Sequence, residues 1–326
     1  MRFLIVGAGG IGAYYGARLM SAGHEVVFVA RGQHLEAMRT HGLSVRHPDF
    51  SFEQAVDAMD QEALVATRDA DDFDLVVLTV KAGNTRSLMN DLQAWLAAAT
   101  TPLLSLQNGV DNEFIIASHI GGERTVGGLA VRIGGHIILP GSVEATGVAQ
   151  VVMGAWKKAA HNPTLQLHLH AVADCFREAS IPTTLSEDIQ RALWRKLLIN
   201  NGVNPLSALT HLDTRSLTSH PVLTRTVYQL MEETALAASA DGVMLERADI
   251  DEMYRLICQF DAIKTSMLVD LEKGRPLELD AISGVVVERC RRLGREAPVT
   301  QLIQALLTNR LAVEEGVRGG AEIETR

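Results

Sequence analysis

Short unbroken apolar runs alternate with helical patterns through the first half of the chain. The runs are RFLIVG, EVVFVAR, FDLVVLTVK, TPLLSLQNG and TVGGLAVRI, and all of them lie between residues 2 and 133. Parallel strands that are buried on both faces have such Val/Ile/Leu-rich runs, and helices between them form βαβ units. The pattern predicts a doubly wound, Rossmann-type α/β sheet. The stretch from Leu43 to Asp72 is less regular than the rest.

The pattern changes twice towards the middle of the chain. From Gly134 to Gly154, short alternating runs broken by Pro and Gly predict antiparallel strands at the sheet edge. From Glu187 to Leu311 nearly all of the periodicity is helical, and Ser186 is a candidate N-cap for the first helix. We therefore expect two domains, a Rossmann-type domain over residues 1–184 and an all-helical domain over residues 185–326.

Composition and charge exclude several classes of function. The chain has 326 residues and a formal net charge of −9, so it offers no broad positive field for nucleic acid or for a membrane surface. No run approaches the roughly 20 apolar residues of a membrane span. The three cysteines, Cys175, Cys258 and Cys290, show neither disulfide nor zinc-site spacing. We expect a cytoplasmic protein.

A glycine motif follows the first predicted strand. Gly7, Gly9 and Gly12 have the spacing G-x-G-x-x-G at the point where the strand ends and a helix begins. Such glycines allow a tight turn, close approach of the backbone to a pyrophosphate, and close packing of the helix on the strand. The motif predicts a dinucleotide site formed by Gly7, Ala8, Gly9, Gly10, Ile11 and Gly12. The alternative is a glycine-rich turn that binds no ligand.

Three basic or polar residues follow later strands of the predicted sheet. Arg31 stands after the second strand, where an acidic residue would bind the ribose of NAD, and its guanidinium could pair with the 2′-phosphate of NADP. Lys81 and Asn108 end two further strand runs. Ligands of open α/β sheets bind at the carboxyl ends of strands, so both residues are expected to face the cofactor. Taken singly, they also fit a surface lysine and an Asn-Gly turn.

The run WRKLLINNGVNPL in the helical half places Lys196, Asn200 and Asn204 four residues apart. On a helix these residues form one polar stripe, which is either a solvent face or the lining of a polar cleft. A positioned lysine ammonium could stabilise and protonate the oxygen of a ketone that receives a hydride. Asn204 has a second interpretation, because Asn204 and Pro205 could be the N-cap and first residue of a renewed helix.

These segments together resemble the ketopantoate reductase (2-dehydropantoate 2-reductase) family over nearly the whole chain. The resemblance is carried by GAGGIG, Arg31, VKA at Lys81, QNG at Asn108, the lysine and asparagine helix, and the segment from Ser266 to Glu278. It implies reduction of 2-dehydropantoate to (R)-pantoate, a step in pantothenate biosynthesis. The glycine motif is common to many dehydrogenases, whereas the lysine helix followed by the second segment is far more specific.

The resemblance also implies a role for each of these residues. The glycine loop, Arg31, Lys81 and Asn108 are expected to bind NADP(H), and Asn108 also approaches the substrate. Lys196 is the expected general acid. The expected ligands of the keto acid are Asn108, Lys196, Asn200, Asn204 and Ser266. Glu278 is expected to act in the catalytic site as a polar partner of the substrate or cofactor.

The chain departs from the family pattern at two positions. Thr214 and Ile263 stand where members of the family often have substrate-binding asparagines, with Lys264 next to them as a possible replacement. A lost amide can change which keto acid is preferred. Reduction of another branched 2-keto acid is therefore a second hypothesis, and a non-catalytic NADP-binding sensor without need of Lys196 is a third.

Two further features of the sequence leave alternatives open. His168 and His170 are two residues apart in a stretch that looks helical, which places them on different faces, and we predict no metal site. The last helices have apolar faces that pack either within the chain or against a second copy in a homodimer. The sequence leaves the oligomeric state open.

Overall fold

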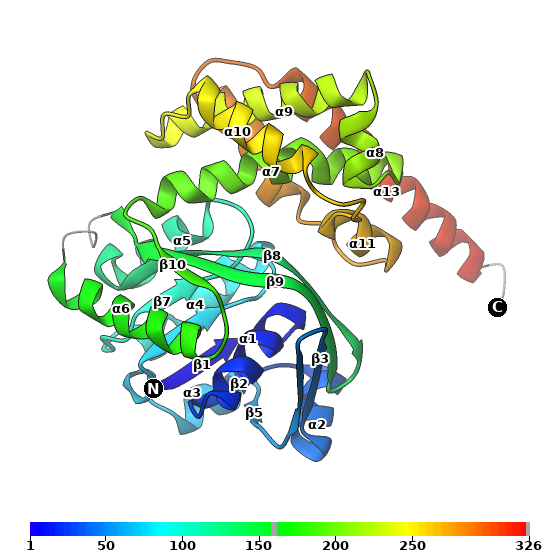
Figure 1. Cartoon of the computed structure of the whole chain (residues 1–326). Helices are drawn as coiled ribbons and strands as arrows, with labels where there is room; N and C mark the ends of the chain where they lie inside the picture. Colours follow the sequence, from blue (N-terminus) through cyan, green and yellow to red (C-terminus); the bar gives the residue numbers. More distant parts are fainter. Residues whose placement is uncertain (158–161, 324–326) are drawn as a thin grey trace. The chain divides into compact units, whose positions relative to one another are not determined.

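The computed structural model describes residues 1–157 and 162–323, and in the last helix it describes side chains up to residue 313. The chain divides into two compact units, Met1–Leu193 and Trp194–Arg326. The first unit combines a sheet with helices, and the second is helical (Figure 1). This arrangement confirms the predicted fold class. The division falls inside helix α7 (Ile189–Thr210), whereas the boundary predicted from the sequence, after residue 184, precedes that helix.

The described part of the first unit contains one mixed sheet of ten strands. In chain order the strands are β1 (Arg2–Val6), β2 (Glu25–Val29), β3 (Leu43–His47), β4 (Phe50–Gln54), β5 (Asp57–Met59), β6 (Leu75–Leu78), β7 (Leu103–Ser105), β8 (Thr125–Leu139), β9 (Ser142–Ala155) and β10 (Thr183–Leu185). The main path through the sheet runs β4-β3-β9-β8-β7-β6-β1-β2-β5, and β10 pairs with β9.

The strand order reverses beside β1. Strands β2 and β5 lie on one side of β1, and β6, β7 and β8 lie on the other, with parallel pairing throughout this part. Between β2 and β5 the chain forms β3 and β4 at the opposite end of the sheet. Open α/β sheets bind their ligands outside the carboxyl ends of the strands at such a switch point. The topology therefore directs attention to the residues that follow β1 and β6.

Helices cover both faces of this sheet. They are α1 (Gly10–Ser21), α2 (Gly32–His41), α3 (Gln61–Thr67), α4 (Thr85–Leu96), α5 (Asn112–Ile120) and α6 (Pro163–Glu178), with short 3₁₀ turns η1 (Ala70–Asp72), η2 (Ala82–Asn84) and η3 (Gly122–Arg124). Successive side chains of a strand point to opposite faces. An unbroken apolar run in a central strand therefore fills two cores at once.

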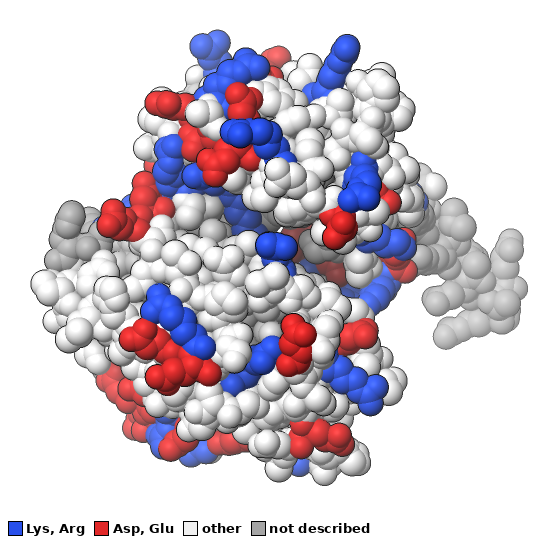
Figure 2. All heavy atoms as spheres, in the orientation of Figure 1, with Lys and Arg blue, Asp and Glu red and all other residues white. Residues whose placement is uncertain are grey.

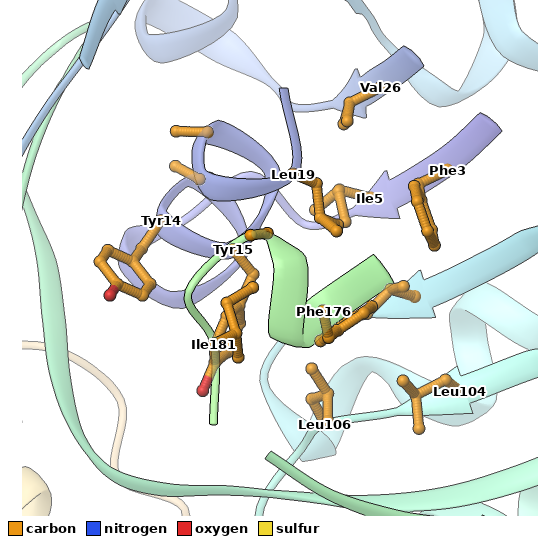
Figure 3. Close-up of a cluster of buried hydrophobic side chains, with 14 of the residues drawn as sticks. Phe3, Ile5, Tyr14, Tyr15, Leu19, Val26, Leu104, Leu106, Phe176 and Ile181 are labelled. Carbon is orange, nitrogen blue, oxygen red and sulfur yellow. The ribbon is translucent and has the colours of Figure 1, made fainter. Parts of the chain in front are cut away.

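Strand β1 shows this division directly. Phe3 and Ile5 belong to the hydrophobic cluster that includes Tyr15 of α1 and Phe176 of α6, and Figure 3 shows these side chains packed together. The intervening Leu4 belongs to a second cluster on the other face, with apolar residues of α3 and α4. Burial on both faces is the physical reason that RFLIV lacks the alternation of a half-exposed strand.

The predicted position of the antiparallel strands is wrong in one respect. β8 and β9 do form an antiparallel hairpin, with a register shift between Val131 and Ile133. However, β9 lies inside the sheet, because β3 pairs with its first residues, Ser142 to Glu144, and β10 pairs with residues Val151 to Met153. At this end of the sheet the edge strand is β4, and β5 is the edge strand at the other end. Strand β9 has 14 residues, and the backbone N–H and C=O groups on its side away from β8 need hydrogen-bond partners. Strands β3 and β10 provide part of them.

The second unit contains helices and turns only, within the residues described. After α7 they are α8 (Thr214–Ser219), α9 (Leu223–Ala238), η5 (Ser239–Asp241), α10 (Arg247–Cys258), α11 (Ser266–Glu272), the π-helical turn η6 (Asp280–Gly284), α12 (Val285–Arg292) and α13 (Pro298–Ile323). Many of their apolar residues are buried. Leu197 and Leu198 of α7, for example, are 1% and 0% exposed.

A buried polar network joins four segments of the helical unit. The Asn201 amide of α7 donates to the hydroxyls of Thr234 in α9 (3.0 Å) and Thr300 in α13 (3.2 Å). Its oxygen accepts from the hydroxyl of Ser283 (2.9 Å). All four residues are buried. Each buried donor that is left unpaired costs about 1–3 kcal/mol, so the network favours one packing arrangement of these helices.

Candidate active site

The glycine-rich loop turns sharply between β1 and α1. Gly7 has φ +104°, a conformation that side chains disfavour, and the N–H groups of Gly7 and Ala8 both donate to Val29 O at 3.0 and 2.9 Å. A Cβ atom on Gly12 would lie 2.4 Å from Gly7 O and from Thr79 Oγ1, whereas space beside Gly9 is open. The strand, turn and helix expected of a dinucleotide loop are therefore all present.

Helix α1 begins at Gly10, with Gly9 at its N-cap. The first N–H groups of a helix lack acceptors within it, and they form the positive end of the helix dipole. Thr79, just after β6, donates its hydroxyl to Gly7 O at 2.8 Å and so ties the loop to the neighbouring strand end. This end of the sheet can accept a phosphate group.

Arg31 lies where the sequence pattern places it, directly beyond β2. It occupies the N-cap position of α2 in an extended conformation (φ −146°, ψ 160°), and its side chain is exposed. Gly32 follows with φ +60°. The guanidinium is thus accessible at the carboxyl end of β2, a position at which it could pair with an anionic group of a bound nucleotide.

Lys81 and Asn108 follow β6 and β7, which are adjacent parallel strands. A buried chain of side chains joins their two loops. Gln107 Nε2 donates to Val80 O at 2.9 Å and to the hydroxyl of Thr85 at 2.7 Å. Thr85 donates to Asn112 Oδ1 at 2.8 Å, and Asn112 Nδ2 donates to the backbone oxygen of Asn108 at 2.8 Å. The network holds both loops in a fixed relation.

Sequence reasoning did not identify this network. Thr85, Gln107 and Asn112 are all buried. The available signal was the presence of polar residues inside apolar stretches, as Gln107 in LLSLQNG, but a polar residue in the sequence gives no indication of its partner. Burial is a tertiary property, so the pairing became visible only in the structure.

Glu113 of α5 is the most unusual titratable group near these loops. Its side chain is 0% exposed, and neither carboxyl oxygen has a hydrogen-bond partner among the described residues. Burial raises its pKa to about 8, while nearby polar groups of Ser105 and Gly128 act more weakly in the opposite direction. The side chain is therefore mainly a neutral carboxylic acid at neutral pH.

In the second unit, α7 carries Lys196, Asn200 and Asn204 on one unbroken helix. The helix continues through Pro205 to Thr210, so the proposed renewal of the helix at Asn204 is wrong. Lys196 and Asn200 are half-buried, and Asn204 is only 6% exposed. A simple solvent face does not explain a buried asparagine, and this favours the polar-lining interpretation of the stripe.

The predicted cap of this helix is also wrong. The Asp188 carboxylate accepts the N–H of Arg191 at 2.9 Å, and Asp188 O accepts the N–H of Ala192, so Asp188 and not Ser186 is the N-cap. Serine and aspartate are both good N-cap residues. Strand β10 ends at Leu185, directly before Ser186. The helix therefore begins two residues later than a cap at Ser186 would require.

Ser266 and Glu278 stand at the starts of consecutive helical segments. Ser266 is the exposed first residue of α11, which Thr265 caps by accepting the N–H of Leu268 at 3.3 Å. Half-buried Glu278 precedes the next helix, and its backbone oxygen accepts the N–H of Ile282 at 3.1 Å. That helix opens with the π-helical turn η6. Such turns are rare and occur frequently at functional sites.

The two positions that depart from the family pattern are tied to each other. The Thr214 hydroxyl donates to Asp261 O at 2.8 Å, and the Thr214 N–H donates to Ile263 O at 3.0 Å. Ile263 itself is 47% exposed. The ammonium of Lys264, the expected replacement, pairs with the Glu272 carboxylate at 2.7 Å. Thr214 is thus used to fix a loop.

The remaining sequence hypotheses concern metal, nucleic acid and membrane. His168 and His170 lie on α6, and His168 Nε2 contacts Asp74 O at 2.8 Å. The described part of the chain contains no cluster of three residues suited to hold a metal ion. On the face drawn in Figure 2, acidic and basic side chains are interspersed. Across residues 1–157 and 162–323, no helix is both long and apolar enough to cross a bilayer.

The Rossmann-type sheet with its glycine loop, followed by a helical unit with a lysine and asparagine stripe, defines a nicotinamide-dependent oxidoreductase that acts on a 2-keto acid. The chain belongs to the ketopantoate reductase PanE/ApbA family. The family model matches residues 3–158, and the model of the family's C-terminal domain matches residues 188–310.

Similar proteins cover almost the full chain. The 2-dehydropantoate 2-reductase of Pyrococcus abyssi is 26% identical over 315 residues, which are 96% of this chain and 99% of the relative. That of Halobacterium salinarum is 28% identical and covers 97% of this chain and 100% of its own length. The crystal structure of a PanE/ApbA family ketopantoate reductase from Ralstonia eutropha JMP134 has a TM-score of 0.83 at 29% identity, over 97% of this chain and 100% of that one.

The same fold occurs in a dehydrogenase that is named for another acid. A ternary structure of D-mandelate dehydrogenase with NADH and anilino(oxo)acetate has a TM-score of 0.84 at 22% identity, over 96% of this chain and 99% of that one. At this level of identity the likeness concerns the fold alone. The fold therefore does not distinguish between keto acids.

Replacing Glu113 by glutamine should stabilise the protein at alkaline pH. The carboxyl is protonated until about pH 8 in the folded chain but ionises near its ordinary value of 4.5 when unfolded. The contribution of this carboxyl to the free energy of unfolding is therefore fully present below pH 4.5 and is lost as pH rises towards 8. We expect the free energy of unfolding of Glu113→Gln, measured with urea, to exceed that of the wild type by about 2 kcal/mol or more at pH 8. At pH 4.5 the two proteins should differ little.

The matched control is Glu123→Gln, which changes an exposed carboxyl in the turn that follows the same helix. It should show no gain that grows between pH 4.5 and pH 8. An equal gain at both pH values in Glu113→Gln would contradict a titrating carboxyl.

Proposed function

We propose that this protein reduces 2-dehydropantoate to (R)-pantoate with NADPH, a step in pantothenate biosynthesis, and that Lys196 is the general acid. Membership of the ketopantoate reductase family over both units supports the reaction class. The observation that carries the proposal is the unbroken polar stripe of α7, on which half-buried Lys196 stands in line with Asn200 and Asn204.

The first unit provides groups that fit a dinucleotide phosphate. The open space beside Gly9 and the N-terminus of α1 suit the pyrophosphate, and Arg31 suits the 2′-phosphate that distinguishes NADPH from NADH. Lys81 and Asn108, which the buried network holds at neighbouring strand ends, are the other proposed cofactor ligands. Bound NADPH supplies the hydride.

The second unit provides the proton and the substrate ligands. As negative charge builds on the ketone oxygen, the Lys196 ammonium stabilises it and then donates a proton. Lys196 is half-buried on α7, between Arg195 and the buried Leu197. We propose Asn200, Asn204 and Ser266 as ligands of the keto acid, together with Asn108. Glu278, at the start of the π turn, is the proposed polar partner that organises the site.

Thr214 and Ile263 favour a second candidate substrate. The Thr214 hydroxyl bonds to a backbone oxygen, and Ile263 presents an apolar side chain that is 47% exposed. An apolar side chain at a position where relatives use an amide lowers the preference for a substrate hydroxyl. A branched 2-keto acid without a hydroxyl is therefore the second candidate.

The direct test is oxidation of NADPH with a panel of 2-keto acids, followed by absorbance. We expect 2-dehydropantoate to give the highest kcat/KM. A different branched keto acid that is better by orders of magnitude would move the assignment to the second candidate. Absence of turnover with every keto acid would favour a non-catalytic NADP-binding sensor.

Removing the proposed acid should abolish most turnover and leave cofactor binding intact. Lys196→Ala should lower kcat about a hundredfold or more, with the Kd for NADPH nearly unchanged. Lys196→Arg keeps the charge but hardly releases a proton, so it should lose nearly as much. The exposed Lys273→Ala is the control and should retain wild-type kcat. Wild-type kcat in Lys196→Ala would refute the role.

Arg31 should decide the choice between the two nicotinamide cofactors. We expect Arg31→Ala to raise the KM for NADPH about tenfold or more, since a charge-assisted pair with the 2′-phosphate is lost. The KM for NADH, which has no such phosphate, serves as the internal control and should stay within about twofold. An equal rise for both cofactors would assign Arg31 to another part of the site.

A further inference from the structure

His34 bridges two segments of the first unit that are distant in the sequence. It lies in the first turn of α2, and its Nε2 is 2.8 Å from Ala8 O in the glycine-rich loop. Its Nδ1 accepts the N–H of Gly141, in the turn between β8 and β9, at 3.0 Å. A backbone N–H can only donate and a carbonyl oxygen can only accept, so Nδ1 is unprotonated and Nε2 carries the proton. The contacts select one neutral tautomer.

The environment of the ring agrees with this protonation state. Burial lowers the pKa of His34, and the hydrogen bond to Ala8 O only partly offsets the effect. A protonated ring would turn Nδ1 into a donor facing the donor of Gly141. The neutral ring therefore satisfies both backbone groups, and a charged ring could satisfy only one.

The same hairpin touches the loop at a second point. A Cβ atom on Gly10 would lie 2.0 Å from the carbonyl carbon of Gly135 in β8, so the two backbones are in direct contact. Near the hairpin turn, a Cβ atom on Gly141 would lie 3.1 Å from Cβ of Ala37 in α2. The β8–β9 hairpin thus packs against both the start of α1 and the middle of α2.

These contacts determine the orientation of one peptide group. The Ala8–Gly9 peptide is planar, so fixing its oxygen also fixes the direction of its N–H. That N–H donates to Gly7 O at 2.7 Å, and the Gly7 and Ala8 N–H groups donate to Val29 O. The remaining acceptor of the turn, Ala8 O, is held by His34. Without the ring, Ala8 O has to find another donor, and the peptide can rotate.

We propose that His34 is a positioning residue for the dinucleotide: its imidazole locks the Ala8–Gly9 peptide to the β8–β9 turn and thereby presets the first turn of α1 for the cofactor's pyrophosphate. This inference rests on the proposed cofactor site. It assigns the histidine no contact with the cofactor. The loss it predicts is confined to the pyrophosphate part of the ligand.

The test compares two ligands in three variants. NADPH contains the pyrophosphate, whereas 2′-AMP has the adenosine 2′-phosphate without it. His34→Ala should raise the Kd for NADPH about tenfold and leave the Kd for 2′-AMP within about twofold. The KM for NADPH should rise about tenfold while kcat falls by less than threefold. His34→Gln, which can donate and accept, should restore NADPH binding, and exposed His41→Ala on the same helix is the control.

Each outcome decides the inference. Unchanged NADPH affinity in His34→Ala, or an equal loss for both ligands, overturns the positioning role and leaves the proposed function standing. Failure of the wild type to bind NADPH and NADH overturns the cofactor site and the positioning role together. If His34→Ala does not fold, the wild-type protein still decides: long-range ¹H–¹⁵N spectra at neutral pH should show His34 as the neutral Nε2–H tautomer, and any other form contradicts the bridge.

Discussion

The close packing of α1 against the ends of three strands is the constraint on which the cofactor end of the molecule depends. Gly12 leaves no room for a side chain, because Gly7 O and Thr79 Oγ1 both lie where its Cβ would be. Val29 at the end of β2 accepts two N–H groups of the loop, and Thr79 beyond β6 donates to Gly7 O. A larger residue would push the helix away from the sheet. The positive end of α1 is therefore fixed by backbone geometry rather than by a charged side chain.

Neighbouring polar residues in the helical unit have different tasks. Asn201 is fully buried, and its amide is satisfied by three hydroxyls from other helices. Asn200 and Asn204, one residue before it and three after it, lie on the stripe with Lys196. Asn201 and its partners thus stabilise the packing of the helices, a different task from the one we propose for the stripe. Glu113 shows the opposite case in the first unit, where burial with no hydrogen-bond partner among the described residues keeps a carboxyl neutral.

Local patterns predicted the features that depend on short stretches of chain. The glycine turn, the polar residues after β2, β6 and β7, and the helical second half all follow from spacing and periodicity. The strands β3 and β10 were not assigned to β9, because pairing between segments about 30 to 100 residues apart has no local signal. Asp188 replaced Ser186 as a cap for a similar reason: both fit locally, and the position where β10 ends decides between them.

Polar residues with tertiary partners also escaped prediction from the sequence. Gln107, Asn112 and His34 form part of ordinary helix or strand patterns, and each has a hydrogen-bond partner that lies 22 to 107 residues away. The roles of Lys196 and the other residues carried over from the family remain proposals about chemistry. Local structure supports them most clearly on α7, where Pro205 does not interrupt the helix.

We propose a hydride transfer to a keto acid that is completed by a proton from Lys196. The most direct measurement is a single turnover with NADPH that carries deuterium in the transferable position at C4 of the nicotinamide, with mass spectrometry of the product. We expect one deuterium on the new carbinol carbon of pantoate and one NADP⁺ per enzyme site. Bound NADPH that stays unoxidised in the presence of 2-dehydropantoate and other 2-keto acids would contradict it.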